Sequence, residues 1–238
     1  MDPRILTLLN DDHFALEQYR KICTKIHLAC DPPEKNCLMI TSSVPAEGKS
    51  LSALNLAIAI AQGIRREVIL IDGDLRYPRL PDFLDIHTDR GLINYLHSNS
   101  DFTEDDGYVL ESLIQPTGID YLSLIPAGGI STNPLEILNS RKLAELMAGL
   151  KRKQRDSYII MDSPPVIPAS DPVILSQYAD WIIYVILAGK TPRETVRKGI
   201  ESLEGGKILG VILNDMEFMP YEYPDAYRTY YYNKTAKG

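Results

Sequence analysis

Short apolar runs alternate along the chain with longer segments in which apolar residues recur at helical spacing. The apolar runs are typical of buried β-strands, and they read CLMITS, EVILID, IDYLSLIP, SYIIMDS, WIIYVILA and KILGVILN. Helical periodicity occupies segments between them, at 49–63, 134–151, 171–178 and 191–204. Repeated alternation of strand and helix predicts an α/β fold with a mainly parallel sheet and helices on both of its faces.

The two ends of the chain differ from this alternating middle. The segment DDHFALEQYRKICTKIHLA predicts a helix, because one face of it carries Ala15, Tyr19, Ile22, Ile26 and Ala29. The last segment, YEYPDAYRTYYYNKTAKG, has neither a helical nor a strand period. We therefore expect an N-terminal helical arm at 1–36, one domain at 37–218 and a flexible tyrosine-rich tail at 219–238. Within the domain, HTDRGLINYL predicts a short helix and SNSDFTEDDG a loop.

Charge and hydropathy narrow the classes of function. The 238 residues carry a net charge of −7, which argues against wrapping nucleic acid and against direct binding to anionic lipid as the main activity. The longest apolar stretches, ALNLAIAIA and WIIYVILAG, are too short to span a bilayer, and MDPRILTLLNDDHF is not a secretion signal. We expect a cytoplasmic protein that needs a partner for any role at a membrane.

The cysteines and histidines show no metal-binding spacing. Cys23, Cys30 and Cys37 are not paired as C-x-x-C, and the four histidines stand in no ligand spacing with cysteine or with one another. We expect the cysteines to be small buried residues of a reducing compartment, and no metal site built from protein side chains alone.

The stretch LMITSSVPAEGKSLSALNLAIAIA predicts a phosphate-binding loop. An apolar strand runs into a turn, then Gly48, Lys49 and Ser50, then a helix. Backbone N–H groups of such a loop and the helix N-terminus bind anionic oxygens, while the lysine reaches the β- and γ-phosphates and the hydroxyl ligates Mg²⁺. The match is imperfect, because the P-loop pattern has glycine where Ser43 stands. The expected nucleotide-binding residues of the loop are Ala46, Glu47, Gly48, Lys49, Ser50 and Leu51.

Aspartates end two further apolar runs. Asp72 and Asp74 lie two residues apart in VILIDGDLRYP, so both carboxylates can point the same way, and Asp162 ends the run in SYIIMDSPPV. The carboxyl ends of parallel strands are where ligands of such sheets bind. These acids are candidates for binding Mg²⁺ or for accepting a proton from a hydroxyl. Ordinary polar strand ends remain the alternative.

Taken together, these motifs resemble the bacterial tyrosine kinases, the cytoplasmic autokinases of capsule and exopolysaccharide synthesis. The resemblance rests on SSVPAEGKS, ILIDGDLR and IIMDSPP, and it continues in LIPAGGISTNPLEIL, AGKTPRETVRKGIESL and the terminal tyrosines. It implies a fold like that of the partitioning and division-site ATPases. It also implies ATP and Mg²⁺ as cofactors, served by Lys49 and Ser50, with Asp72, Asp74 and Asp162 around the metal and the incoming hydroxyl.

The resemblance also assigns roles to single residues. Asp72 is the candidate for activating the tyrosine, and Asn214 at the end of GVILN is a candidate contact for adenine. Arg76 is a candidate assistant, although a surface ion pair accounts for it equally well. Val44 stands where the partitioning ATPases carry a signature lysine, which favours the kinase branch.

Two positions depart from the family pattern. The family loop usually has glycine where Ala46 stands, and a positive φ there would cost alanine roughly 1 kcal/mol and weaken catalysis. The family's ring-assembly motif E-x-x-R-x-x-R is matched by Glu17 and Arg20, but Cys23 replaces its second arginine. That replacement leaves a ring-shaped oligomer in doubt, and a Glu17–Arg20 pair within one helix is the alternative.

The tail then becomes the expected phosphoacceptor. Six of the fourteen tyrosines lie in it, at Tyr221, Tyr223, Tyr227, Tyr230, Tyr231 and Tyr232. The resemblance implies a transmembrane activator of the polysaccharide co-polymerase type, homo-oligomers formed through the N-terminal helix and the tail, a cognate tyrosine phosphatase, and a place at the inner face of the plasma membrane. A partitioning-type ATPase switch, a weakly active nucleotide-binding scaffold and a tail packed on the domain remain open alternatives.

Overall fold

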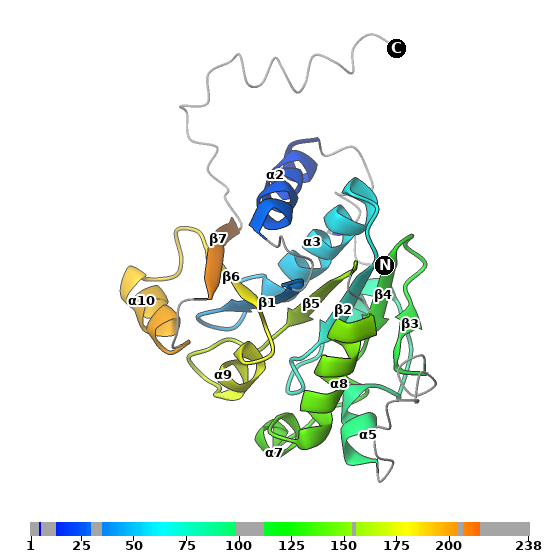
Figure 1. Ribbon diagram of the computed structural model, residues 1–238. Coiled ribbons are helices and arrows are strands. Elements are labelled where there is room, and N and C mark those ends of the chain that lie inside the picture. The colour runs from blue at the N-terminus through cyan, green and yellow to red at the C-terminus, as the bar shows by residue number, and fades with distance from the viewer. Residues whose placement is uncertain are drawn as a thin grey trace, which may run out of the picture.

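The fold is a single seven-stranded sheet between two layers of helices (Figure 1). The computed structural model describes residue 5 and residues 13–29, 35–98, 112–153, 156–203 and 207–214. The strand order is β3-β4-β2-β5-β1-β6-β7. The strands are β1 (Cys37–Ser42), β2 (Val68–Asp72), β3 (Gln115–Pro116), β4 (Leu122–Ile125), β5 (Tyr158–Asp162), β6 (Trp181–Leu187) and β7 (Ile208–Asn214).

Six of the strands are parallel and β3 alone pairs antiparallel, at the edge beside β4. Every residue of β1, β2 and β5 is buried, because helices cover both faces of the sheet centre. Continuous apolar runs, rather than alternating ones, are therefore what these strands require. The predicted parallel α/β sheet is confirmed.

Two apolar cores lie on opposite faces of the sheet. Helices α2 and α3 cover one face, and α5, α7, α8 and α9 cover the other (Figure 1). The helices described are α2 (His13–Ala29), α3 (Lys49–Gly63), α4 (Leu80–Leu84), α5 (Leu92–His97), α7 (Pro134–Leu138), α8 (Arg141–Lys153), α9 (Asp171–Ser176) and α10 (Arg193–Glu201).

The segment 134–151 forms two helices, where the sequence pattern predicts one. α7 ends at Leu138, and the hydroxyl of Ser140 accepts a hydrogen bond from the N–H of Leu143 at 3.3 Å. Serine at this position satisfies a free N–H of the first turn of α8, so the chain restarts a helix there. The apolar period alone does not reveal the break.

Three short elements differ from those that the sequence pattern predicts. The two-residue strand β3 and the five-residue helix α4 have no expected counterpart, and α10 begins only after Pro192 although a helix was expected from residue 191. Elements of this length bury too few residues to show a period.

Helix α2, near the N-terminal end of the chain, packs against α3 (Figure 1). Cys23 is 3% exposed within this contact, so the position that would carry the second arginine of the assembly motif faces the core. Glu17 and Arg20 form an ion pair at 3.7 Å within the helix. Cys23 and Cys37 are both free and buried as expected, whereas Cys30 lies outside the described residues.

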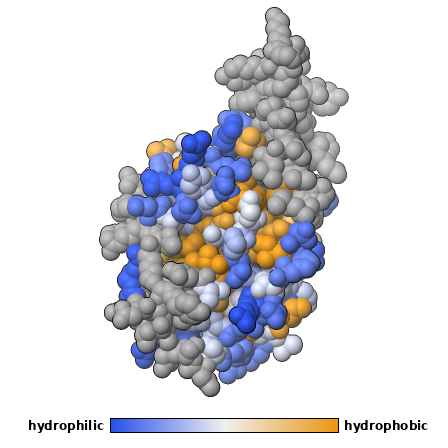
Figure 2. All heavy atoms as spheres, turned by 90° about the vertical axis from the view of Figure 1, so that its right-hand side faces the viewer, coloured by the Kyte–Doolittle hydropathy of each residue, from blue (hydrophilic) through white to orange (hydrophobic). Residues whose placement is uncertain are grey.

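The surface keeps some large apolar side chains. In the face shown in Figure 2, apolar residues gather in the centre and hydrophilic residues surround them.

Two large side chains at the carboxyl edge of the sheet are also exposed. Tyr77 and Ile130 are about three-quarters exposed, and they follow β2 and β4. Within the described ranges, no helix is both long and apolar enough to cross a bilayer.

Candidate active site

The loop between β1 and α3 has the backbone shape of a phosphate cradle. Ala46 and Gly48 both take positive φ angles, 65° and 85°, and α3 begins directly afterwards at Lys49. Glycine is favoured at position 48 by its φ, and a Cβ there would lie 2.0 Å from Nδ2 of Asn214, so the Asn214 side chain would have to move. Ser43, where the P-loop pattern has glycine, bonds through Oγ to the hydroxyl of Tyr184 at 2.9 Å.

Lys49 is the cation at the centre of the site. Its Nζ lies 2.8 Å from Oδ2 of Asp74, 3.8 Å from Oδ1 of Asp162 and 3.2 Å from Oγ of Ser50. Burial lowers the pKa of the ammonium, but the carboxylates of Asp162 and Asp74 outweigh burial and the pKa is raised. Lys49 therefore stays charged and, in the nucleotide-free chain, is held by Asp74.

Asp72 is a buried carboxylate with one committed oxygen. Its Oδ2 accepts the N–H groups of Arg79 at 3.2 Å and Leu80 at 3.1 Å, whereas Oδ1 has no hydrogen-bond partner among the described residues. Burial and, next, the charge of Asp162 raise its pKa well above the ordinary value. A raised pKa makes a carboxylate a better base near neutral pH.

Asp162 lies directly beside Asp72 in the parallel register of β2 and β5. Both oxygens of Asp162 are buried without a hydrogen-bond partner among the described residues. Burial raises its pKa to about 6, although the ammonium of Lys49 acts in the opposite direction. Unpartnered buried carboxylate oxygens are costly, and a cation that enters with a ligand would satisfy them.

The three acids do not form a ready metal cage. Within the described part of the chain, no group of three or more histidine, cysteine or acidic side chains is arranged to hold a metal ion by itself. Mg²⁺ ordinarily keeps several waters and binds through one or two carboxylates together with the phosphates of its substrate. The free oxygens of Asp72 and Asp162 fit that arrangement, with Ser50 next to Lys49.

The other residues that the sequence predicts for the site lie in the phosphate loop or next to it. Asn214 donates from Nδ2 to the carbonyl oxygen of Glu47 at 3.0 Å, so it touches the loop directly. The side chain of Glu47 is buried beneath the loop, and Leu51 packs partly buried against the apolar core. All six tail tyrosines lie outside the described residues.

Arg76 bonds to a buried partner that the sequence did not single out. Its guanidinium donates to both oxygens of Asp171, at 2.7 Å and 3.2 Å, and the Asp171 side chain is fully buried. The pair ties the loop after β2 to the first turn of α9. Asp171 stands before Pro172 at a helix start, so in the sequence it resembles an ordinary capping residue.

The chain is similar to proteins named as tyrosine kinases. The chain is 33% identical over 216 residues to the tyrosine-protein kinase YwqD of Bacillus subtilis, covering 90% of this chain and 86% of that protein. It is 32% identical over 215 residues to the tyrosine-protein kinase ptk of Acinetobacter johnsonii, of which it spans only 28%. A search against models of known families finds no match.

Solved structures give the same picture. The kinase domain of VpsO superposes with a TM-score of 0.71 and 34% identity over 86% of this chain and 97% of that chain. The kinase domain of the Escherichia coli tyrosine kinase ETK superposes at 0.76 with 28% identity, over 92% of this chain and 84% of that one. The cell division ATPase MinD of Pyrococcus furiosus, at 0.60 and 23% identity over 75% of this chain and 71% of that one, shares the fold.

Proposed function

This chain belongs to the bacterial tyrosine-protein kinases, and we propose that it transfers the γ-phosphoryl group of ATP to tyrosines of its own C-terminal tail. One observation carries the proposal. A buried lysine and three buried acids meet at the carboxyl ends of β1, β2 and β5, and three of the carboxylate oxygens have no hydrogen-bond partner among the described residues.

Each residue then has a chemical task. The N–H groups of the loop and the ammonium of Lys49 bind the phosphates, which requires Lys49 to exchange Asp74 for phosphate oxygens. The free oxygen of Asp72 accepts the phenolic proton as the tyrosine attacks, while its other oxygen stays fixed by Arg79 and Leu80. A Mg²⁺ ion bound with the nucleotide, near Asp162 and Ser50, would neutralise charge on the transferring group.

Asn214 suits an adenine base better than a guanine base. Its Nδ2 is committed to the carbonyl oxygen of Glu47, so Oδ1 is the group left to face a ligand. An amide oxygen accepts from the exocyclic amine of adenine and repels the carbonyl oxygen that guanine carries at the equivalent position. This orientation supports ATP over GTP as the phosphate donor.

The last described residue before the tail touches the phosphate loop. Residue 214 both ends β7 and touches the phosphate loop, and 215–238 follow it. We propose that the tail tyrosines of one copy are phosphorylated in the site of a second copy within a homo-oligomer, with the copy's own site as the alternative. Each phosphate adds roughly −1.5 to −2 charges, so a loaded tail is repelled from the acidic site and loosens the assembly. A transmembrane activator of the polysaccharide co-polymerase type, a cognate phosphatase and a role in exopolysaccharide export complete this proposal.

Loss of Lys49 tests the proposal directly. Purified wild-type chain incubated with ATP and Mg²⁺ should become strongly positive in a phosphotyrosine immunoblot, and Lys49→Met should remove the signal because the phosphates lose their cation. Lys151→Met is the matched control, since Lys151 also pairs with an aspartate, Asp180, but far from the loop. Equal labelling of Lys49→Met and Lys151→Met would refute the assignment.

Replacing the six tail tyrosines by phenylalanine separates the kinase from its alternatives. The variant should lose most phosphotyrosine and retain the ATP affinity of the wild type. Undiminished labelling would place the acceptor elsewhere. Release of phosphate by the wild type without any phosphotyrosine would identify a partitioning-type ATPase switch, and calorimetry without an ATP signal would exclude both.

A further inference from the structure

Glu47 belongs to the phosphate loop, but its carboxylate is buried against the protein and does not face the side of the loop where phosphate would bind. The residue is 1% exposed, although Ala46 before it is exposed. Its Oε2 accepts the N–H of Val44 at 2.7 Å. Its Oε1 accepts the N–H of Leu187 at 3.3 Å and the hydroxyl of Thr191 at 2.5 Å. Glu47 thus binds one donor of its own loop, one donor at the last residue of β6 and one donor in the loop after β6.

A negative charge in this place works against anion binding. The ion pairs found in the described ranges do not include Glu47, so no lysine or arginine there neutralises it. Its carboxylate lies beneath a loop that has to attract phosphate, and like charges at this range repel. A direct contact with nucleotide therefore does not explain the residue, whereas satisfying three donors does.

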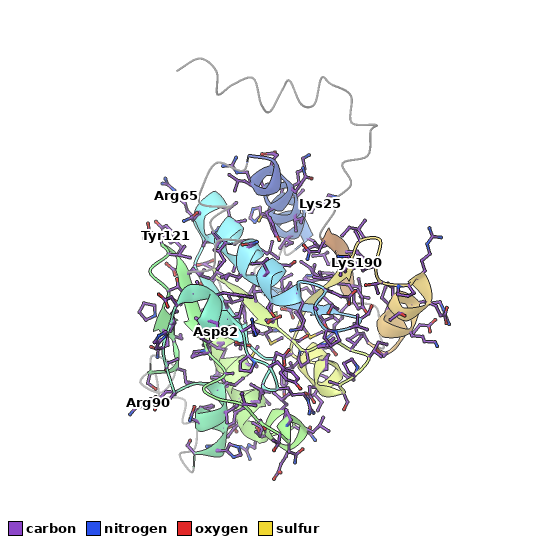
Figure 3. All side chains as sticks on the ribbon, turned by 180° about the vertical axis from the view of Figure 1, so that it is seen from behind. Lys25, Arg65, Asp82, Arg90, Tyr121 and Lys190 are labelled. Carbon is purple, nitrogen blue, oxygen red and sulfur yellow. The ribbon has the colours of Figure 1, made fainter. Side chains whose placement is uncertain are left out.

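The contacts of Glu47 close a ring of hydrogen bonds between three strand ends. Asn214 at the end of β7 donates to the carbonyl oxygen of Glu47 at 3.0 Å, and its own carbonyl oxygen accepts the N–H of Ala188 at 2.9 Å. Lys190, labelled in Figure 3, marks the loop between β6 and α10 that also carries Thr191. The loop after β1 is consequently fastened to the ends of both β6 and β7.

We propose that Glu47 is a positioning residue that holds the phosphate loop in its anion-binding shape, and that Thr191 in the loop after β6 acts on nucleotide affinity through it. The inference rests on the proposed nucleotide site. Without the carboxylate, the turn from Val44 to Gly48 loses this anchor but keeps its backbone-carbonyl contacts with Asn214 and Ser42, and the positive φ of Ala46 relaxes more readily. Nucleotide must then reorganise the loop on binding, which lowers affinity.

Three isosteric or near-isosteric variants of the full chain test the proposal. Glu47→Gln keeps the shape but turns an amide NH₂ toward a donor, Thr191→Val removes one donor, and Thr191→Ser retains it. Calorimetry with ADP and Mg²⁺ should show about tenfold weaker binding for Glu47→Gln and about threefold for Thr191→Val, with Thr191→Ser near the wild type. The Michaelis constant for ATP should rise in parallel, and this rise should account for most of the change in kcat/KM of tail phosphorylation.

Two further readouts separate positioning from a general loss of structure. The double variant Glu47→Gln/Thr191→Val should weaken binding by less than the product of the two single effects, because both changes alter the same contact. In the nucleotide-free chain, Glu47→Gln should speed amide hydrogen exchange at Val44 and Leu187. If Glu47→Gln fails to fold, Thr191→Val against Thr191→Ser carries the test.

The contrary results are equally specific. Unchanged or tighter ADP binding by Glu47→Gln, additive effects in the double variant, or equal weakening by Thr191→Ser and Thr191→Val would each overturn the positioning role. A wild-type chain that binds neither ADP nor ATP would instead overturn the proposed function, so the two failures are distinguishable.

Discussion

Ala46 shows how one residue can depart from a loop pattern and still keep the loop. Its φ of 65° lies in the left-handed region, where an alanine Cβ approaches the following carbonyl oxygen. Position 46 does take a positive φ, which is the condition under which alanine carries a cost there. The strain is local, because the side chain is exposed and meets no neighbour that would have to move.

We therefore predict that Ala46→Gly stabilises the chain. Relief of the left-handed strain is worth roughly 1–2 kcal/mol, and the greater freedom of glycine in the unfolded chain offsets about half of it. The melting temperature in calorimetry should rise by about 2–4 °C for a net gain of ~1 kcal/mol. Ala144→Gly is the control, because Ala144 is exposed within α8 and glycine there should lower it. A fall with both variants would show that Ala46 is unstrained.

Residues that end strands are the ones a sequence can place. Asp72 and Asp162 end apolar runs and Lys49 stands just after the loop that follows β1, and parallel strands bring these positions to one edge, where the structure holds them together. The orientation of Glu47 is different, because it depends on Leu187 and Thr191, about 140 positions along the chain. No local period reports such a contact, so a reading of the loop alone assigns Glu47 to the nucleotide.

At the level of elements, the same distinction separates what is predictable from what is not. β1, β2 and β5 are central and fully buried, so their apolar runs define them. The boundary between α7 and α8 depends on one hydroxyl, that of Ser140. The short strand β3 exists only because it pairs with the neighbouring strand β4. Such features are set by single hydrogen bonds and by tertiary context.

The Arg76–Asp171 pair joins two of these elements and should be worth more than a surface pair. Arg76→Ala leaves Asp171 buried without its cation, and we expect a loss of about 1–2 kcal/mol in denaturant unfolding. That is below the ~3–5 kcal/mol of fully buried pairs, since a third of Arg76 is exposed. Arg197→Ala on α10 is the control, because its two glutamate partners are more than half exposed.

A second substitution tells whether the stability is lost because the ion pair is gone or because the Asp171 carboxylate is left buried and charged. Adding Asp171→Asn to Arg76→Ala should restore part of the stability, because the unpaired buried carboxylate is then neutral. If Arg76→Ala and Arg197→Ala destabilise equally, or if the second change lowers stability further, the pair does not hold the loop after β2 on α9.

Across the whole molecule, the nucleotide-free chain carries an unfavourable cluster of charge at its centre. Asp72, Asp74 and Asp162 share one ammonium, Lys49, and the pKa of Asp72 is raised first by burial and then by Asp162. The folded chain therefore keeps a proton on Asp72 at pH values where the unfolded chain has released it. It follows that the free energy of unfolding falls as the pH rises from the unfolded pKa through the folded one.

Asp72→Asn should consequently stabilise the protein while abolishing its activity. The amide oxygen can still accept the N–H groups of Arg79 and Leu80, but the residue no longer ionises. In calorimetry without nucleotide, the melting temperature of the variant should exceed that of the wild type, and by more at pH 8 than at pH 5. Asp82→Asn, at an exposed position of α4, should show no such growth with pH, because burial is what disfavours the charge of Asp72. A variant that is less stable at pH 8, or that still labels its tail with phosphotyrosine, would contradict the role of Asp72 as the desolvated base.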